Sequence, residues 1–302
     1  MVRSTCLFTA VALATCWLFS DCARADEERK VIVCSTTQAA DFSRQVVGDR
    51  WEVLCVLAPG QDPHLYQIKP KDTELITHAD LCVQNGWHLE GKDWMKTLAE
   101  DVGKPLVTCV TGAKPHELNQ EEGTINDPHA WFSPANAAVY VKNIQRAVSQ
   151  IDPLWASEYE ARAQLYVTQL RTLHAWIQSQ VNDIPANRRI LVTSHDAFNY
   201  FCRDYGFIAK SPAGWSTGAE IGAGPTPKRR KETVKSIRES GVKAIFVETS
   251  VNPTMIEEIA KEAGVSVGGK LYSDSMGQRG TAGETYISMM RENVLKIVQA
   301  LK

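Results

Sequence analysis

The sequence lacks an excess of charge of either sign. Its 302 residues include 33 lysines and arginines against 35 aspartates and glutamates, which gives a formal net charge of −2. Proteins that bind nucleic acid carry a clustered excess of positive charge, so we expect no nucleic acid among the partners of this chain. Beyond its first residues the sequence also lacks any apolar run long enough to cross a bilayer.

The sequence also lacks a CxxC pair, and the number of cysteines that follow the N-terminal segment is odd. These cysteines are Cys34, Cys55, Cys82, Cys109 and Cys202. The first four lie inside apolar runs typical of strands. A disulfide framework or a zinc site built from cysteines is therefore not expected. We expect small, buried core residues instead.

The chain begins with a segment typical of a signal peptide. Arg3 supplies a positive charge, 6–19 is an apolar run too short for a comfortable transmembrane helix, and Ala23-Arg24-Ala25 resembles a cleavage site. We therefore predict a signal peptide at 1–25 and export to the periplasm. A lipid anchor would use Cys22, but Asp21 occupies a position where a small residue is wanted, so we expect soluble release in preference to lipidation.

Strand-like runs alternate with helical patterns through most of the chain, which favours parallel sheets flanked by helices. We predict strands at 30–34, 51–57, 79–84, 105–110, 189–193, 243–248 and 265–272. The polar stretch 112–126 is expected to be a loop. The prediction is an α/β fold with two lobes, 26–152 and 184–302, each a mainly parallel sheet flanked by helices.

One helix is expected to join the lobes, over 153–183. Apolar residues recur there at spacings of three and four, which is one face of a helix: Tyr159, Ala163, Tyr166, Leu170, Leu173, Ile177 and Val181. The run covers about 29 residues, or roughly 43 Å at the rise of an α-helix. No glycine or proline interrupts it before Pro185. We interpret it as a long rigid helix.

Three histidines and one aspartate follow predicted strands, two in each half of the chain. His64 and His129 each end an Asp-Pro-His tripeptide, while His195 and Asp274 follow strands of the second half. Ligands of open α/β sheets bind at the carboxyl ends of strands. Placed across a cleft between the lobes, these side chains would form a site suited to zinc or manganese. Four protein ligands favour holding the metal over using it in catalysis.

Each of these residues also has a purely structural interpretation. A histidine after a proline can be an ordinary hydrogen-bonded loop residue, and Asp274 in Ser-Asp-Ser can form a turn or cap a helix. Glu248 ends a strand, where it could accept a histidine N–H beside a metal or serve as a cap. The remaining histidines are expected at or near the surface: His78, His88, His116 and His174.

Several motifs in the right order make the sequence similar to a known family. They are 59–66 (PGQDPHLY), 85–92 (NGWHLEGK), 127–131 (DPHAW), 194–198 (SHDAF), 244–253 and 272–277 (YSDSMG). Together they resemble the metal-binding solute-binding proteins of ABC transporters, the TroA-like or cluster 9 group. The resemblance covers essentially all of 30–302.

The resemblance implies two α/β lobes joined by one long helix, with a metal clamped between them by His64, His129, His195 and Asp274. It also implies a monomer that is not an enzyme and delivers its metal to a membrane permease and ATPase subunits. Some manganese members carry a glutamate where His195 stands, whereas dedicated zinc members often have a histidine-rich loop ahead of the second ligand. Here that loop holds only His116. Zinc and manganese therefore both stay open at this point, and iron with them.

Two other functions compete with metal delivery. An exported zinc hydrolase would need an open coordination position and a general base, yet the chain has no HExxH helix and no convincing base beside the four residues. A surface adhesin is the other alternative. No repeat or large exposed apolar stretch in the sequence supports it.

Overall fold

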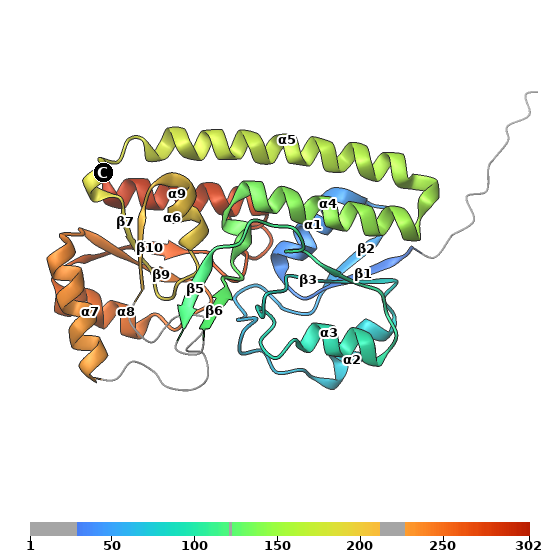
Figure 1. The fold of residues 1–302 in the computed structure, drawn as a ribbon, viewed down its shortest axis with the longest axis horizontal. Coiled ribbons are helices and arrows are strands. Elements are labelled where there is room, and N and C mark those ends of the chain that lie inside the picture. Colours follow the sequence, from blue (N-terminus) through green and yellow to red (C-terminus); the bar gives the residue numbers. More distant parts are fainter. Residues whose placement is uncertain (1–28, 121–122, 212–226) are drawn as a thin grey trace, which may run out of the picture.

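The computed structural model describes residues 29–120, 123–211 and 227–302 and has the predicted α/β fold (Figure 1). The N-terminal lobe contains four parallel strands in the order β2-β1-β3-β4. These strands are β1 (Val31–Cys34), β2 (Glu52–Cys55), β3 (Leu81–Gln84) and β4 (Leu106–Thr108). The helices between them are α1 (Thr37–Val47), α2 (Pro70–Thr77) and α3 (Trp94–Asp101). Parallel pairing brings the carboxyl ends of all four strands to one edge.

The strands of the C-terminal lobe form two parallel pairs. They are β7 (Ile190–Val192) with β8 (Ile208–Lys210), and β9 (Ala244–Glu248) with β10 (Ser266–Leu271). β7 lies next to β9. The helices of this lobe are α6 (Asn199–Tyr205), α7 (Pro227–Ser240), α8 (Thr254–Ala263) and α9 (Tyr286–Leu301). β8 has only three residues, and its sequence, Ile-Ala-Lys, gave no strand signal.

The long helix is α5 (Ala156–Val181), which follows α4 (Pro134–Ile151) after a single 3₁₀ turn, η2 (Pro153–Trp155). The predicted helix therefore begins three residues late, because Pro153 opens the 3₁₀ turn instead. All seven apolar residues of its predicted face are buried. They pack against α1 and α4 on one side and α9 on the other, and α5 runs along both lobes (Figure 1).

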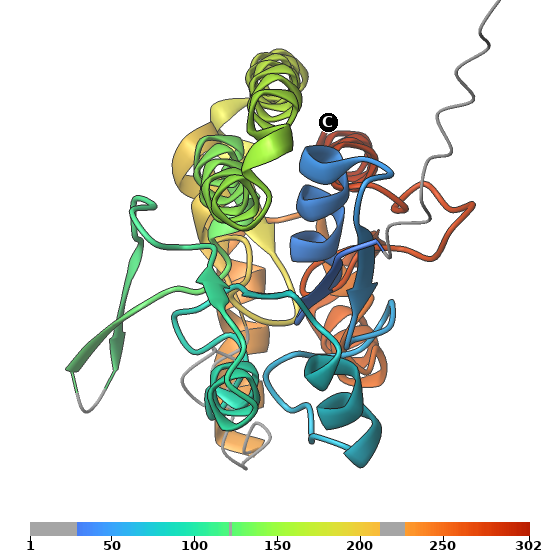
Figure 2. The same cartoon turned by 90° about the vertical axis from the view of Figure 1, so that its right-hand side faces the viewer.

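The prediction of a loop at 112–126 is wrong, because this stretch contains an antiparallel pair of strands, β5 (Glu117–Gln120) and β6 (Gly123–Asn126). Figure 2 shows this hairpin projecting from the body of the protein. Its polar sequence has no alternation of apolar residues that would have indicated a strand. Its base is held by the C-terminal lobe, where the backbone N–H of His116 donates to the hydroxyl of Tyr200 at 2.9 Å.

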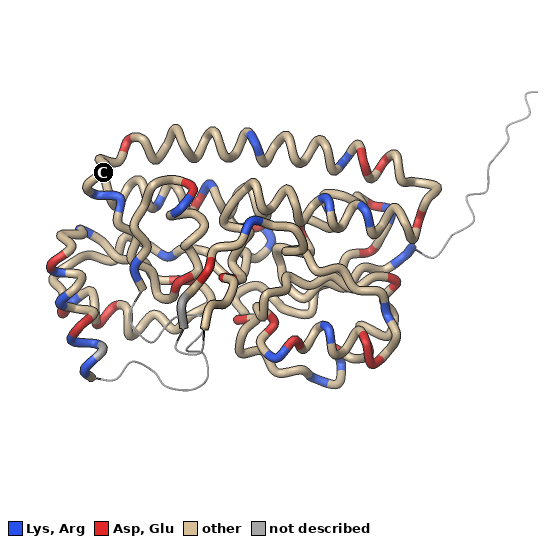
Figure 3. The backbone as a smooth tube through the Cα atoms, in the orientation of Figure 1, with Lys and Arg blue, Asp and Glu red and all other residues tan. Residues whose placement is uncertain are grey.

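One apolar core runs through both lobes rather than stopping at their boundary. It joins residues of β1, α1, α4 and α5 to residues of α6, β9 and α9. Two smaller clusters cover the opposite face of each lobe, packed under α2 and α3 in one lobe and under α7 and α8 in the other. The five cysteines of the described chain are free, and four of them are buried, as expected. Charges of both signs are spread over both lobes, in keeping with the small net charge (Figure 3).

Hydrogen bonds also cross between the lobes close to the expected site. The Gln38 side chain donates to the carbonyl of Ser273 at 3.0 Å, and the backbone N–H of Tyr286 donates to Asp41 at 3.0 Å. In the opposite direction, the hydroxyl of Tyr200 donates to the carbonyl of Asp127 at 2.7 Å. The loop that carries Asp274 is thus held by the N-terminal lobe, and the loop that carries His129 by the C-terminal lobe.

We predict that the lobes barely move relative to each other when metal binds. The shared core and the crossing hydrogen bonds would have to break for the lobes to separate, and α5 offers no loop hinge. Small-angle scattering of metal-free and metal-loaded protein should give nearly superimposable profiles. A clear fall in radius of gyration on loading would contradict this prediction.

Candidate metal centre

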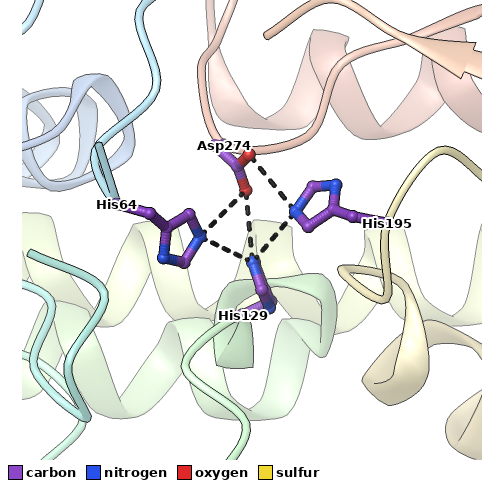
Figure 4. A group of neighbouring side chains, drawn as sticks. All are labelled: His64, His129, His195 and Asp274. Carbon is purple, nitrogen blue, oxygen red and sulfur yellow. Dashed lines mark hydrogen bonds and ion pairs between the residues drawn. The ribbon is translucent and has the colours of Figure 1, made fainter. Parts of the chain in front are cut away.

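The structure brings His64, His129, His195 and Asp274 together between the two lobes (Figure 4). One potential ligand atom from each lies within 4.8 Å of the others, and all four residues are buried. His64 comes from the loop between β2 and α2, and His129 from the turn after β6. His195 follows β7, and Asp274 follows β10. Each lobe therefore contributes two side chains, although His129 follows the unpredicted strand β6 rather than the strand predicted at 105–110.

The separations between these atoms match those around a four-coordinate metal ion. Nε2 of His129 lies 3.2 Å from Nε2 of His64 and 3.3 Å from Nε2 of His195. Oδ1 of Asp274 is 3.2 Å from the same nitrogen of His129. Four ligands placed 2.0–2.1 Å from zinc in a tetrahedron are about 3.3 Å apart. The contact between His64 Nε2 and Asp274 Oδ1 is longer, at 3.9 Å.

The two Asp-Pro-His tripeptides hold their histidines differently. Oδ1 of Asp127 accepts from the backbone N–H of His129 at 2.9 Å and also lies 2.7 Å from its Nδ1. A proton on Nδ1 leaves Nε2 free to face the metal. Asp62 accepts from the backbone N–H of His64 at 2.8 Å. Asp127 therefore contacts both the backbone and the imidazole ring of its histidine.

Glu248 contacts both the ring and the backbone of His195. Oε2 of Glu248 lies 2.6 Å from Nδ1 of His195, and Oε1 accepts from the backbone N–H of His195 at 2.9 Å. The sequence left two roles open for Glu248, beside a histidine or as a cap. The structure places it beside His195. Helix α6 begins only at Asn199, so His195 lies in a loop where Glu248 can reach it.

The pKa of one histidine in the cluster is lowered, whereas the pKa values of the other two are raised. Burial lowers the pKa of His64 to about 3, and nearby Asp274 offsets only part of that effect. Burial also opposes the charged form of His129, but Asp127 and Asp274 outweigh it and raise the pKa to about 10. The pKa of His195 is likewise well above its usual value, because Asp274 and Glu248 overcome burial. The pKa of Asp274 lies well below its usual range, since the two histidines overcome its burial.

The other histidines of the described chain lie away from this cluster. His78, His88 and His174 are exposed, and His116 is half-buried at the base of the hairpin. His88 pairs with Asp93 at 3.5 Å, and Nδ1 of His174 lies 3.0 Å from the hydroxyl of Tyr205. The four predicted residues are the ones that the fold brings together.

We predict that Glu248→Gln weakens metal binding by about 10- to 100-fold, the usual cost of losing a partner that orients a ligand histidine. An amide at this position still accepts from the backbone of His195 but no longer bears the charge that favours a proton on Nδ1. Titration of metal-free protein with an indicator chelator measures the change. Glu257→Gln, on the exposed face of α8, is the matched control and should bind as the parent does. Equal affinity in both variants would contradict the role of Glu248.

Comparison with known proteins agrees with this geometry. The model of a protein family described as zinc-uptake complex component A, periplasmic (ZnuA), matches residues 32–300. This chain belongs to that family. The manganese-binding lipoprotein MntA of Bacillus subtilis is 36% identical, covering 98% of this chain and 97% of the relative. The zinc-binding protein TroA of Treponema pallidum is 34% identical, covering 92% and 90%.

Solved structures of the family share the fold. The structure of periplasmic zinc-binding protein TroA from Treponema pallidum superposes with a TM-score of 0.84 at 30% identity, covering 90% of this chain and 99% of that one. A manganese-bound periplasmic metal-binding protein from Candidatus Liberibacter asiaticus gives a TM-score of 0.80 at 28% identity, covering 91% and 100%. The relatives are thus binding proteins for metals, which fits a role other than catalysis.

One expectation about the N-terminus is not borne out. We expected soluble release in preference to lipid anchoring, but MntA, SloC of Streptococcus mutans and PsaA of Streptococcus pneumoniae are all named lipoproteins. The signal peptide at 1–25 and Cys22 lie outside the described residues. Among the residues that the structure describes, no helix is long and apolar enough to cross a membrane.

Proposed function

We propose that this chain is the exported substrate-binding component of a metal ABC transporter. It captures one divalent transition metal ion, zinc or manganese, with His64, His129, His195 and Asp274, and releases it to a membrane permease driven by ATPase subunits. The observation that carries this proposal is the convergence of four buried ligand atoms within 4.8 Å, two from each lobe. Membership of the zinc-uptake family supports it.

The chemistry of the cluster favours carrying a metal over catalysis with it. A catalytic zinc keeps one position open for water, whereas structural and transported ions are enclosed by protein ligands. Four protein atoms surround the proposed ion here, and two other carboxylates beside the cluster, Asp127 and Glu248, are engaged with histidines. Neither is placed to act as a general base on a bound water. The hydrolase and adhesin alternatives are therefore not favoured.

The organisation proposed for the chain follows from the same argument. We propose a signal peptide at 1–25, an N-terminal lobe at 26–152, the linking helix at 153–183 and a C-terminal lobe at 184–302. The protein acts as a monomer in the periplasm or at the outer side of the membrane. Treatment of exported protein with a detergent that separates lipidated from soluble chains distinguishes anchoring at Cys22 from release after residue 25.

Elemental analysis of protein purified from the exported compartment tests the function. We expect one equivalent of zinc or manganese per chain. Metal-free protein is then titrated with the two ions in competition, which gives their relative affinities. A protein that carries neither ion after purification, and binds neither with micromolar or better affinity in solution, would exclude this function.

A further inference from the structure

The carboxyl end of β9 contributes no ligand, yet it contacts both ligands of the C-terminal lobe. Glu248, its last residue, lies against Nδ1 of His195. Two positions later, the hydroxyl of Ser250 donates to Oδ2 of Asp274 at 3.1 Å. Ser250 lies in the turn that follows β9, where the backbone N–H of Val251 donates to the carbonyl of Glu248 at 3.4 Å, and this turn brings the hydroxyl to the second ligand. Asp127 and Glu248 account for the orientation of two histidines, whereas Ser250 touches the only carboxylate among the ligands.

The two oxygens of Asp274 are in different surroundings. Oδ1 faces His129 at 3.2 Å and His64 at 3.9 Å. Oδ2 lies 3.3 Å from Nε2 of His195 and receives the Ser250 hydroxyl. A carboxylate only accepts hydrogen bonds, so the proton of Ser250 points to Asp274. The 2.9 Å contact between Ser250 and Ser273 must then have Ser273 as its donor.

We propose that Ser250 determines how Asp274 binds the metal, and through this the preference between zinc and manganese. The hydroxyl donates to Oδ2 at 3.1 Å and competes there with the ion, whereas Oδ1 receives no such hydroxyl, so that Asp274 binds mainly through Oδ1. Three imidazoles and one carboxylate oxygen then give a four-coordinate site. This inference rests on the proposed function, because it takes the four residues as ligands.

The physical basis is the difference in coordination between the two ions. Zinc is held almost always by four ligands in a tetrahedron, whereas manganese favours oxygen ligands and octahedral geometry. A carboxylate that binds through both oxygens adds a ligand atom and therefore suits manganese better than zinc. Ser250 is a positioning residue in this scheme: it does not touch the metal, but its hydrogen bond competes with binding through Oδ2.

The test is the ratio of the manganese to the zinc dissociation constant in Ser250→Ala. We expect this ratio to fall by about tenfold, the lower end of the usual effect of a residue that orients a metal ligand. Ser250→Thr keeps the hydroxyl and should keep the ratio of the parent protein. Ser179→Ala removes an exposed hydroxyl on α5, a helix that carries none of the four residues, and it is the matched control.

Cobalt(II) bound in place of the native metal provides a readout that a general loss of structure would not produce. Four-coordinate cobalt absorbs visible light strongly, and five- or six-coordinate cobalt absorbs weakly. We expect strong absorption in the parent protein and weaker absorption in Ser250→Ala. Weak absorption in the parent protein, an unchanged ratio in Ser250→Ala, or an equal change in Ser179→Ala would overturn the inference. Failure of the parent protein to bind zinc, manganese or cobalt would instead exclude the proposed function.

Discussion

Asp274→Ala should weaken metal binding at least tenfold, and we expect about 100-fold or more, which corresponds to about 2.7 kcal/mol of binding free energy. Asp274 is the only anionic side chain among the four proposed ligands. Its removal deletes a ligand and leaves an ion of charge +2 among neutral imidazoles in a buried site. Asp127 and Glu248 remain nearby, but each contacts the far nitrogen of a histidine rather than the centre of the cluster.

Two further variants separate the charge of Asp274 from its shape. Asp274→Asn keeps an oxygen in place without the negative charge, so its affinity should fall between those of the parent and Asp274→Ala. His78→Ala is the control: His78 is an exposed histidine at the end of α2 with a negative φ that alanine adopts freely. Calorimetric titration of metal-free protein measures all three. Unchanged affinity in Asp274→Ala would remove this residue from the site.

Three of the four positions proposed as metal ligands could be predicted from sequence because of one property of parallel sheets. The carboxyl ends of their strands share an edge, so polar residues that follow different strands are brought close together. His64, His195 and Asp274 each follow a strand that the apolar pattern revealed, and the structure places them together. His129 instead follows β6, which was not predicted. From sequence, His129 was placed after the strand predicted at 105–110, and the Asp-Pro-His tripeptide and the resemblance to a family supported its assignment.

The residues that orient these ligands could not be predicted with the same certainty. Glu248 lies 53 positions from His195 in the sequence. Asn199 donates to Asp127 at 3.0 Å, and these two residues are 72 positions apart. Such contacts depend on how loops of different lobes meet, and no local pattern records that. Ser250 belonged to a recognised motif, but nothing in its sequence context distinguished a hydroxyl aimed at a carboxylate from one aimed at solvent.

Metal binding should stabilise the fold strongly at neutral pH and much less in acid. The ion binds a site assembled from both lobes, so it binds the native state far better than the unfolded chain. The gain is about 4 kcal/mol when free metal exceeds the dissociation constant 1,000-fold. At about 2–4 °C for each kcal/mol, the thermal midpoint should rise on the order of 10 °C.

The structure changes what we expect of the protons that compete with the metal. From sequence, three histidines titrating near 6.5 would lose their ligand character together. The pKa of His64 is instead about 3, so this imidazole is neutral throughout the relevant range. The pKa of His129 is raised to about 10 and that of His195 well above its usual value, so these two hold protons at neutral pH when no metal is bound. Binding should therefore release up to two protons.

The sign of the pH effect follows from these two histidines. The raised pKa of His129 stabilises the metal-free fold fully below about pH 6.5, the unfolded value, and this contribution is lost as the pH rises through about 10. Acid therefore favours the metal-free fold, while protons displace the metal from the loaded one. With two protons released, each fall of one pH unit reduces the binding free energy by up to about 2.7 kcal/mol.

Thermal midpoints of metal-free and loaded protein, measured at matched free metal between pH 7 and about pH 5, provide the test, since unperturbed imidazole titrates within that range. The gap between the two midpoints should be wide at pH 7 and nearly closed at the acid end. Calorimetry in buffers of different ionisation enthalpy counts the released protons independently, and Asp127→Asn should lower that count because it weakens the hold on the His129 proton. A gap that stays constant over this range, or binding that releases no protons, would mean that His129 and His195 do not meet the metal. The ligand assignment would then have to be rebuilt around other residues.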